Sequence, residues 1–93
     1  MSPHFSWDSR KAAGNLRKHG VSFQEAATAF KDAYSITIPD PDHSSGEIRF
    51  LVIGASIWNR LLVVAHAERG DELRIISARL ATRREREDYE EGN

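Results

Sequence analysis

The sequence contains no cysteine among its 93 residues, which excludes a disulfide framework and a thiolate metal site and fits a reducing compartment. It lacks an apolar run near the ~20 residues of a membrane helix, and its N-terminus lacks the features of a signal peptide. Phosphate-binding P-loop, GxGxxG and GxSxG motifs are also missing. We therefore expect a cytoplasmic protein without a membrane contact, a nucleotide fingerprint or a serine-hydrolase site.

An excess of basic charge is missing as well, since the formal net charge is −1. The charges are nevertheless unevenly placed: basic residues prevail in 1–20 and 49–86, and acidic residues prevail in 25–48 and 87–91. Such a chain can fold into a basic face and an acidic face, so the composition permits nucleic-acid binding without implying it. The length and the 40% apolar content predict a single domain, residues 1–93, with a modest core.

Three helices are predicted from caps and apolar periodicity. Asp8 is a good N-cap for a helix over residues 9–19, and Gly20 stands where a left-handed C-cap glycine belongs. Ser22 and Thr82 each precede a glutamate by three residues and so predict capping boxes for a second and a last helix. The apolar side chains expected to pack on the sheet are Leu16, Phe23 and Phe30.

Four segments have the pattern of strands, namely residues 34–38, 47–55, 61–66 and 72–80. Short turns between them make the neighbouring strands antiparallel. The aromatic segment 4–7 has the pattern of a small edge strand. The order α-α-β-β-β-β-α predicts an α+β domain in which helices cover one face of a small antiparallel sheet. The other face, or one end of it, is left for function.

The register of the last hairpin stays open at the level of sequence. A two-residue turn at Gly70-Asp71 places His66 opposite Ile75, whereas a three-residue turn places it opposite Arg74. A slip of one residue moves every side chain to the other face. The sequence therefore does not determine whether His66 and Arg79 share a face.

A turn-rich stretch carries the one group of residues that resembles a metal site. Asp40, Asp42 and His43 are close in sequence, but the chain has no HExxH motif and no zinc-like spacing. Aspartate and proline are favoured in turns because they cap them and fix φ. We expect a solvated turn here, and neither a metal ion nor another cofactor.

The densest cationic feature is the segment 74–86, which contains five arginines. Arg74 and Arg79, like Arg49 earlier in the chain, stand among apolar strand residues, so each needs an anionic partner. The partner is either a carboxylate of the chain or a phosphate, which matches the guanidinium fork. The candidate carboxylates are Glu47, Glu68 and Glu85. The arginines of the last helix have acidic residues four positions on and are expected to form a solvated surface.

Histidine and lysine could complete a site for RNA cleavage. Internal attack by the 2′-hydroxyl requires a base, cations at the scissile phosphate and an acid, and none of these has to be a metal ion. The ordinary pKa of histidine lies near neutral, which makes His19 and His66 candidates. The alternatives are a helix C-cap for His19 and a sheet histidine with a backbone partner for His66.

Separated motifs in this sequence resemble the BrnT family, the toxins of bacterial type II toxin–antitoxin modules. They are Trp7-Asp8, residues 15–26, residues 43–49, and residues 74–81 followed by Glu85 and Tyr89. The resemblance implies a fold like that of RelE-type ribonucleases and a toxin that arrests growth by cleaving RNA. It also implies a cognate BrnA antitoxin with a ribbon-helix-helix domain, through which the toxin reaches operator DNA only indirectly.

The resemblance, together with the residue chemistry, defines a predicted site. The predicted catalytic residues are Arg79, Arg49, Lys18, His19 and His66. The residues predicted to bind RNA are Arg74, Arg69 and Tyr89. The predicted function is a metal-independent endoribonuclease acting through 2′-hydroxyl attack. The alternative is a non-catalytic interaction module that binds a partner protein near Ile57 and Trp58.

Overall fold

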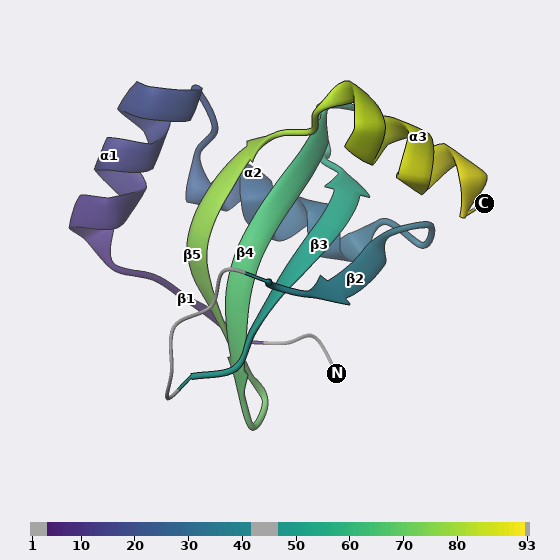
Figure 1. The fold of residues 1–93 in the computed structure, drawn as a ribbon. Helices are drawn as coiled ribbons and strands as arrows, with labels where there is room; N and C mark the ends of the chain where they lie inside the picture. The colour runs from purple at the N-terminus through teal and green to yellow at the C-terminus, as the bar shows by residue number, and fades with distance from the viewer. Residues whose placement is uncertain (1–3, 42–46, 93) are drawn as a thin grey trace.

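The computed structural model describes residues 4–41 and 47–92, which form a five-stranded sheet flanked by helices (Figure 1). The architecture is the predicted α+β class. The elements in chain order are β1 (His4–Ser6), α1 (Ser9–His19), α2 (Phe23–Thr28), the 3-10 turn η1 (Ala29–Lys31), β2 (Ile36–Pro39), β3 (Arg49–Ala55), β4 (Leu61–Arg69), β5 (Glu72–Leu80) and α3 (Arg83–Glu91).

The strands lie in the order β1-β5-β4-β3-β2. The four strands predicted from the sequence pair antiparallel. The edge strand expected near residues 4–7 is present as β1, and it pairs parallel to β5, which makes the sheet mixed rather than purely antiparallel. The reason is that β1 and β5 are far apart in sequence, so no short turn imposes an antiparallel pairing on them.

The predicted caps largely form. Asp8 accepts hydrogen bonds from two backbone N–H groups of the first turn of α1, and Gly20 ends that helix with φ 69°. Thr82 and Glu85 form a complete capping box. The box predicted at Ser22 is only half formed, because Ser22 Oγ accepts from the Glu25 N–H while the Glu25 carboxylate binds Arg60 instead.

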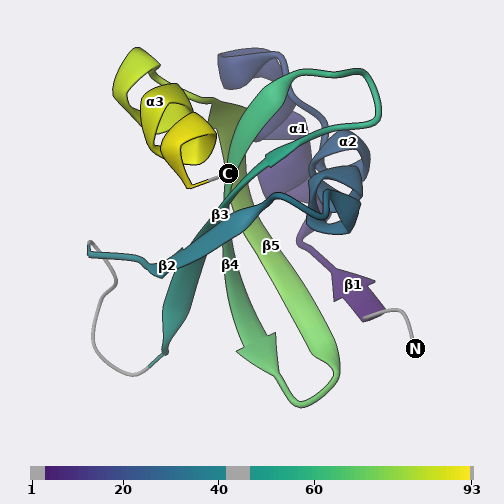
Figure 2. The same ribbon diagram turned by 90° about the vertical axis from the view of Figure 1, so that its right-hand side faces the viewer.

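Helices cover both faces of the sheet, with α1 and α2 on one side and α3 on the other (Figure 2). The larger core cluster lies under α2 and includes Phe23 and Leu62, while Tyr89 of α3 packs on a smaller one. The prediction that Leu16 faces the core is wrong, since it is 51% exposed. The buried residue of α1 is its neighbour Asn15, because the polar ties of Asn15 set the rotation of the helix.

The β4–β5 hairpin has the two-residue turn, with Arg69 opposite Glu72 and His66 opposite Ile75. A register shift then occurs between Ala65 and His66. Ala65 is opposite Ser77, so one residue of β5, Ile76, has no partner, as in a β-bulge. Beyond the bulge Arg79 lies opposite Val63. Successive strand residues point to opposite faces, so His66 and Arg79 lie on opposite faces of the sheet.

Candidate functional site

The sheet face opposite α1 and α2, which we call the arginine face, carries the arginines of β3, β4 and β5. Residues in cross-strand register point to the same face, and the core clusters distinguish the two faces. α3 covers one end of this face, near Ile53 and Val63. The residues of the arginine face include Arg49, Leu51, Ile53, Val63, Ala65, Ala67, Arg69, Glu72, Arg74, Ser77 and Arg79.

Arg79 lies at the α3 end of this face and is fixed by Glu85. Its Nη1 and Nη2 donate to the two carboxylate oxygens at 2.7 and 2.9 Å, and Glu85 also accepts the Thr82 N–H at 2.8 Å. These contacts, the Arg79 hydrogen bonds foremost, lower the pKa of Glu85 to about 2. The Arg79 side chain is 39% exposed, and its Nε–H has no hydrogen-bond partner in the described part of the chain. It is therefore both held in place and able to bind a further anion.

The opposite end of the arginine face holds Arg49, Arg69 and Arg74. Arg69 is paired with Glu47 through Nε, at 3.1 Å, and Nη2. Arg49 Nε lies 3.9 Å from the carboxylate oxygen Oε1 of Glu47, which is beyond hydrogen-bond distance. Arg79 lies in a cross-strand row with Val63 and Ile53. Four residues along β3 separate Arg49 from Ile53, which corresponds to about 13 Å. The structure thus does not bring Arg49 together with Arg79.

Lys18 and His19 lie in the last turn of α1, one turn beyond Asn15. The Asn15 side chain donates to the Ala78 carbonyl at 2.8 Å and accepts from the Ala78 N–H at 3.1 Å. It thereby pairs with the outer edge of β5 as a further strand would. Because Ala78 is the neighbour of Arg79, this tie places the Lys18–His19 corner at the same end of the sheet as Arg79.

Asn15 is a functional-site neighbour that the sequence analysis missed. Its amide also donates to the Val21 carbonyl at 2.9 Å, so it joins α1, the start of α2 and β5. Asn15 is the first residue of the motif over residues 15–26, but its sequence position alone gave it no structural role. Its spacing of three residues from Ala12, which packs against the core, was the available indication.

His66 belongs to the other face and is 1% exposed. Its ring contacts Phe30 edge-on, at a centroid distance of 4.9 Å, and lies 5.9 Å from Phe50. Its Nε2 is 3.4 Å from Glu68, and its Nδ1 is buried without a partner among the described residues. His66 is thus separated by the sheet from Arg79.

Tyr89 links α3 to the rest of the fold. Its hydroxyl donates to Asp32 at 2.6 Å, and this hydrogen bond raises the Tyr89 pKa to about 12. Asp32 also accepts the Ala55 N–H at 2.8 Å. Tyr89 therefore lies at the α3 end of the arginine face, with its ring against the smaller core cluster.

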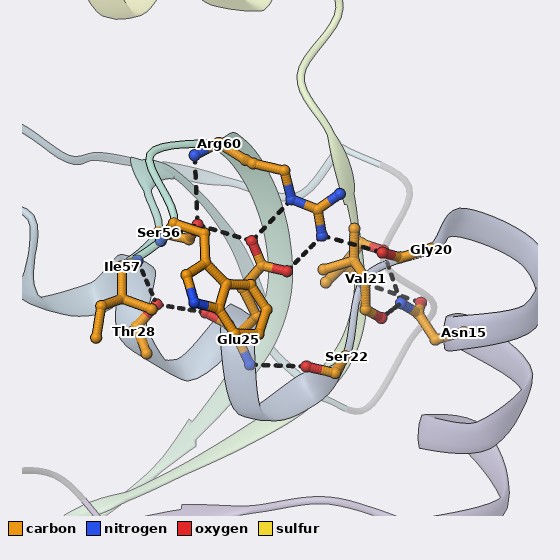
Figure 3. A network of polar contacts seen from close by, with 11 residues as sticks. Asn15, Gly20, Val21, Ser22, Glu25, Thr28, Ser56, Ile57 and Arg60 are labelled. Carbon is orange, nitrogen blue, oxygen red and sulfur yellow. Dashed lines mark hydrogen bonds and ion pairs between the residues drawn. The ribbon is translucent and has the colours of Figure 1, made fainter.

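A buried polar network fixes the loop between β3 and β4 (Figure 3). The Glu25 carboxylate accepts from Ser56 Oγ at 2.7 Å and from Arg60 Nε at 2.9 Å, and hydrogen bonding to Arg60 is the main cause of its lowered pKa. Arg60 also donates to the Gly20 carbonyl at 3.0 Å. This network joins the end of α1, the start of α2 and the loop after β3. Its members lie far apart in sequence, so the sequence did not reveal it.

Ile57 and Trp58 at the tip of that loop are 72% and 67% exposed. Within residues 4–41 and 47–92, no three histidine, aspartate or glutamate side chains gather as metal ligands. Asp42 and His43, which the sequence analysis considered for a metal, lie outside the described residues. In the same part of the chain no helix is long and apolar enough to cross a membrane.

Comparison with known proteins identifies relatives by sequence and by structure. A family model described as "Ribonuclease toxin, BrnT, of type II toxin-antitoxin system" matches residues 7–85. Among solved structures, the crystal structure of the Brucella abortus ribonuclease toxin, BrnT, has a TM-score of 0.70 at 24% identity, covering 88% of this chain and 100% of that chain. No curated protein sequence matches the chain. At this identity the structural match establishes the shared fold.

Proposed function

The chain belongs to the BrnT family of ribonuclease toxins of type II toxin–antitoxin systems, and we propose that it arrests growth by cleaving RNA without a metal ion. The observation that carries the proposal is Arg79, a guanidinium fixed by Glu85 with its Nε–H directed to no described residue. A fixed cation of this kind stabilises charge that develops on a phosphate, because it needs no reorganisation during the reaction.

The reaction that fits these residue types is internal transfer. The 2′-oxygen attacks the adjacent phosphorus as its proton passes to a base, and the bond from phosphorus to the 5′-oxygen breaks. The leaving oxygen takes a proton from an acid, which gives a 2′,3′-cyclic phosphate and a 5′-hydroxyl. Arginine, lysine and histidine can supply the charge and the proton transfers.

Within this mechanism Arg79 binds the scissile phosphate, and the Lys18–His19 corner supplies a further cation and a group for proton transfer. Support for this grouping comes from Asn15, which ties α1 to the strand position next to Arg79. We leave His66 out of the catalytic group because its side chain is buried, with its ring near those of Phe30 and Phe50. We assign Tyr89 to holding α3 in place through Asp32.

Membership of a type II toxin–antitoxin family implies an antitoxin partner. We propose that this partner is of the BrnA type, with a ribbon-helix-helix domain, and that the toxin reaches operator DNA only through it. An antitoxin could neutralise the toxin by placing carboxylates on the arginine face or by covering the apolar loop.

A second candidate function, a non-catalytic module that binds a partner protein, is favoured by the exposure of Ile57 and Trp58. Neighbouring exposed apolar side chains are typical of interaction sites. Overexpression distinguishes the two functions, since a pure binding module leaves cellular RNA intact while a ribonuclease cleaves it.

The chemistry is tested by incubating the purified chain with RNA in excess chelator and analysing the product ends. The proposal predicts cleavage with 2′,3′-cyclic phosphate and 5′-hydroxyl ends, and no cleavage where the nucleotide before the scissile bond lacks its 2′-hydroxyl. Loss of cleavage in chelator, or cleavage of the 2′-deoxy substrate, would overturn the mechanism.

A further inference from the structure

Arg49 and Arg74 form one cross-strand row on the arginine face, with Ala67 between them. Arg49 is opposite Ala67 across β3 and β4, and Ala67 is opposite Arg74 across β4 and β5. Neighbouring strands lie ~4.8 Å apart, so the two arginine Cα atoms are about 10 Å apart. Ala67 is fully buried and contributes only a methyl group. The row therefore places two cations on either side of one small residue.

Neither arginine of this row is neutralised by a close ion pair in the described part of the chain. The nearest carboxylate oxygen to Arg49 is that of Glu47, at 3.9 Å from Nε, and this Nε is buried without a hydrogen-bond partner. Arg74 forms no hydrogen bond or ion pair with a residue of 4–41 or 47–92. A buried donor left unpaired is costly, and an anion that accepted from it would remove that cost.

The carboxylates at this end of the face are engaged elsewhere. Glu47 accepts two hydrogen bonds from Arg69, and the charges of Arg49 and Arg74 also act on it. Glu72 accepts from Ser6 Oγ at 2.6 Å. Asp8, which Arg74 influences through its charge, caps α1. Arg49, Arg69 and Arg74 thus share the Glu47 carboxylate, which leaves an excess of positive charge at this end of the face. An anion with several oxygens matches the two guanidinium forks of the row.

The position of the row relative to Arg79 indicates the class of anion. Four residues of β4 separate the two rows, which corresponds to about 13 Å. The row between them consists of Leu51, Ala65 and Ser77, none of which carries a charge. A chain with phosphates at regular intervals can contact both cationic ends of the arginine face.

We propose that the Arg49–Arg74 row binds a second backbone phosphate of single-stranded RNA, a few nucleotides from the phosphate at Arg79. This inference rests on the proposed ribonuclease function. The row supplies substrate affinity and sets the minimum length of a well-bound RNA, while the chemistry stays at Arg79.

The test uses 2′-O-methyl RNA, which lacks the nucleophile and stays uncleaved. Affinity is measured over a range of salt concentrations for a dinucleotide and for an oligonucleotide of about ten nucleotides, a usual site size. The variant is Arg49→Gln/Arg74→Gln. The matched control is Arg83→Gln/Arg84→Gln, which removes the same charge from exposed positions of α3.

The proposal predicts that the row variant binds the longer oligonucleotide roughly 10-fold more weakly. The slope of the logarithm of its binding constant against the logarithm of the salt concentration should be shallower by about 0.7. The control variant and the dinucleotide should show little change. With cleavable RNA the row variant should raise KM and leave kcat unchanged. Equal effects in the two double variants, or a loss confined to kcat, would overturn the proposal.

If the double variant does not fold, Arg74→Gln is compared with Arg84→Gln in the same binding experiment. The expected effect on affinity is then about half as large.

The ribonuclease function and the second phosphate site can each be contradicted without the other. A wild-type chain that binds the longer oligonucleotide through the row but cleaves no RNA contradicts the ribonuclease function alone. A chain that cleaves RNA while the row variant behaves like its control contradicts the second phosphate site alone.

Discussion

The Arg79–Glu85 pair leads to a prediction about stability and pH. In Glu85→Gln the carboxylate is replaced by an amide, which still accepts the Thr82 N–H and so keeps the capping box, while the charge pair with Arg79 is lost. The substitution therefore isolates the ion pair from the helix cap. We expect it to lower the free energy of unfolding at pH 7.

The size of the effect follows from the pKa of Glu85, which falls from 4.5 to about 2 on folding. This difference corresponds to at most ~3.4 kcal/mol. Because the Arg79 side chain is 39% exposed, solvent screening reduces the expected loss to about 2 kcal/mol.

The sign of the pH dependence follows from the same values. The folded state binds the Glu85 proton more weakly than the unfolded state, so the stabilisation is fully present above pH 4.5 and disappears as the pH falls toward 2. At about pH 3 the difference between wild type and Glu85→Gln should be less than half of its value at pH 7.

Urea unfolding at pH 7 and pH 3, followed by circular dichroism, measures both quantities. Glu87→Gln is the matched control, because Glu87 also lies on α3 but its partner Arg83 is 93% exposed and 3.6 Å away. The control should change stability by less than about 0.5 kcal/mol. An equal loss in both variants, or a loss in Glu85→Gln that is the same at pH 7 and pH 3, would refute the reasoning.

Four further substitutions, in three predictions, test the scaffold of the site. Asn15→Leu leaves buried backbone groups of the α2 start and β5 unpaired and should cost about 2–4 kcal/mol of unfolding free energy; a loss under about 1 kcal/mol would contradict the proposed tie. In Gly54→Ala the new Cβ would lie 2.7 Å from a carbonyl oxygen of η1, so we expect the free energy of unfolding to fall by about 1–3 kcal/mol. Gly14→Ala, whose Cβ has space in α1, should instead raise the free energy of unfolding by about 0.5–1 kcal/mol. Thermal melts in which both substitutions shift the melting temperature in the same direction would contradict this. Tyr89→Phe removes the hydrogen bond to Asp32 and should lower the free energy of unfolding by about 1 kcal/mol. Ultraviolet titration of the variant should no longer show the tyrosine ionisation near pH 12, and its persistence would contradict the assignment.

The features that the sequence predicted well depend on neighbouring residues. Caps at Asp8 and Thr82 formed because a short polar side chain meets the free N–H groups of the next turn. A turn at Gly70 formed because this residue adopts φ 62°, which glycine does at little cost, but the sequence left open whether the turn has two or three residues. The class of fold followed from the order of these local elements.

The features that the sequence did not predict depend on contacts between distant residues. Asn15 is a polar residue of the kind usually found on a surface. It is buried here because its side chain pairs with the backbone at the edge of β5. Glu25 has the spacing of a capping box, yet Arg60, from a loop distant in sequence, binds its carboxylate. The bulge at Ile76 shifts the register of β5 and so decides which face Arg79 occupies. Residue spacing alone does not predict any of these interactions.

Cleavage of RNA by the Arg79→Ala variant tests the central claim most directly. With excess chelator present, and at a temperature where all variants are folded, kcat/KM is compared for wild type, Arg79→Ala, Arg79→Lys and the control Arg84→Ala. The account predicts a loss of about 100- to 1,000-fold for Arg79→Ala, a similar loss for Arg79→Lys because the fork geometry is removed, and nearly wild-type cleavage for Arg84→Ala. Cleavage by Arg79→Ala at the wild-type rate would contradict the account.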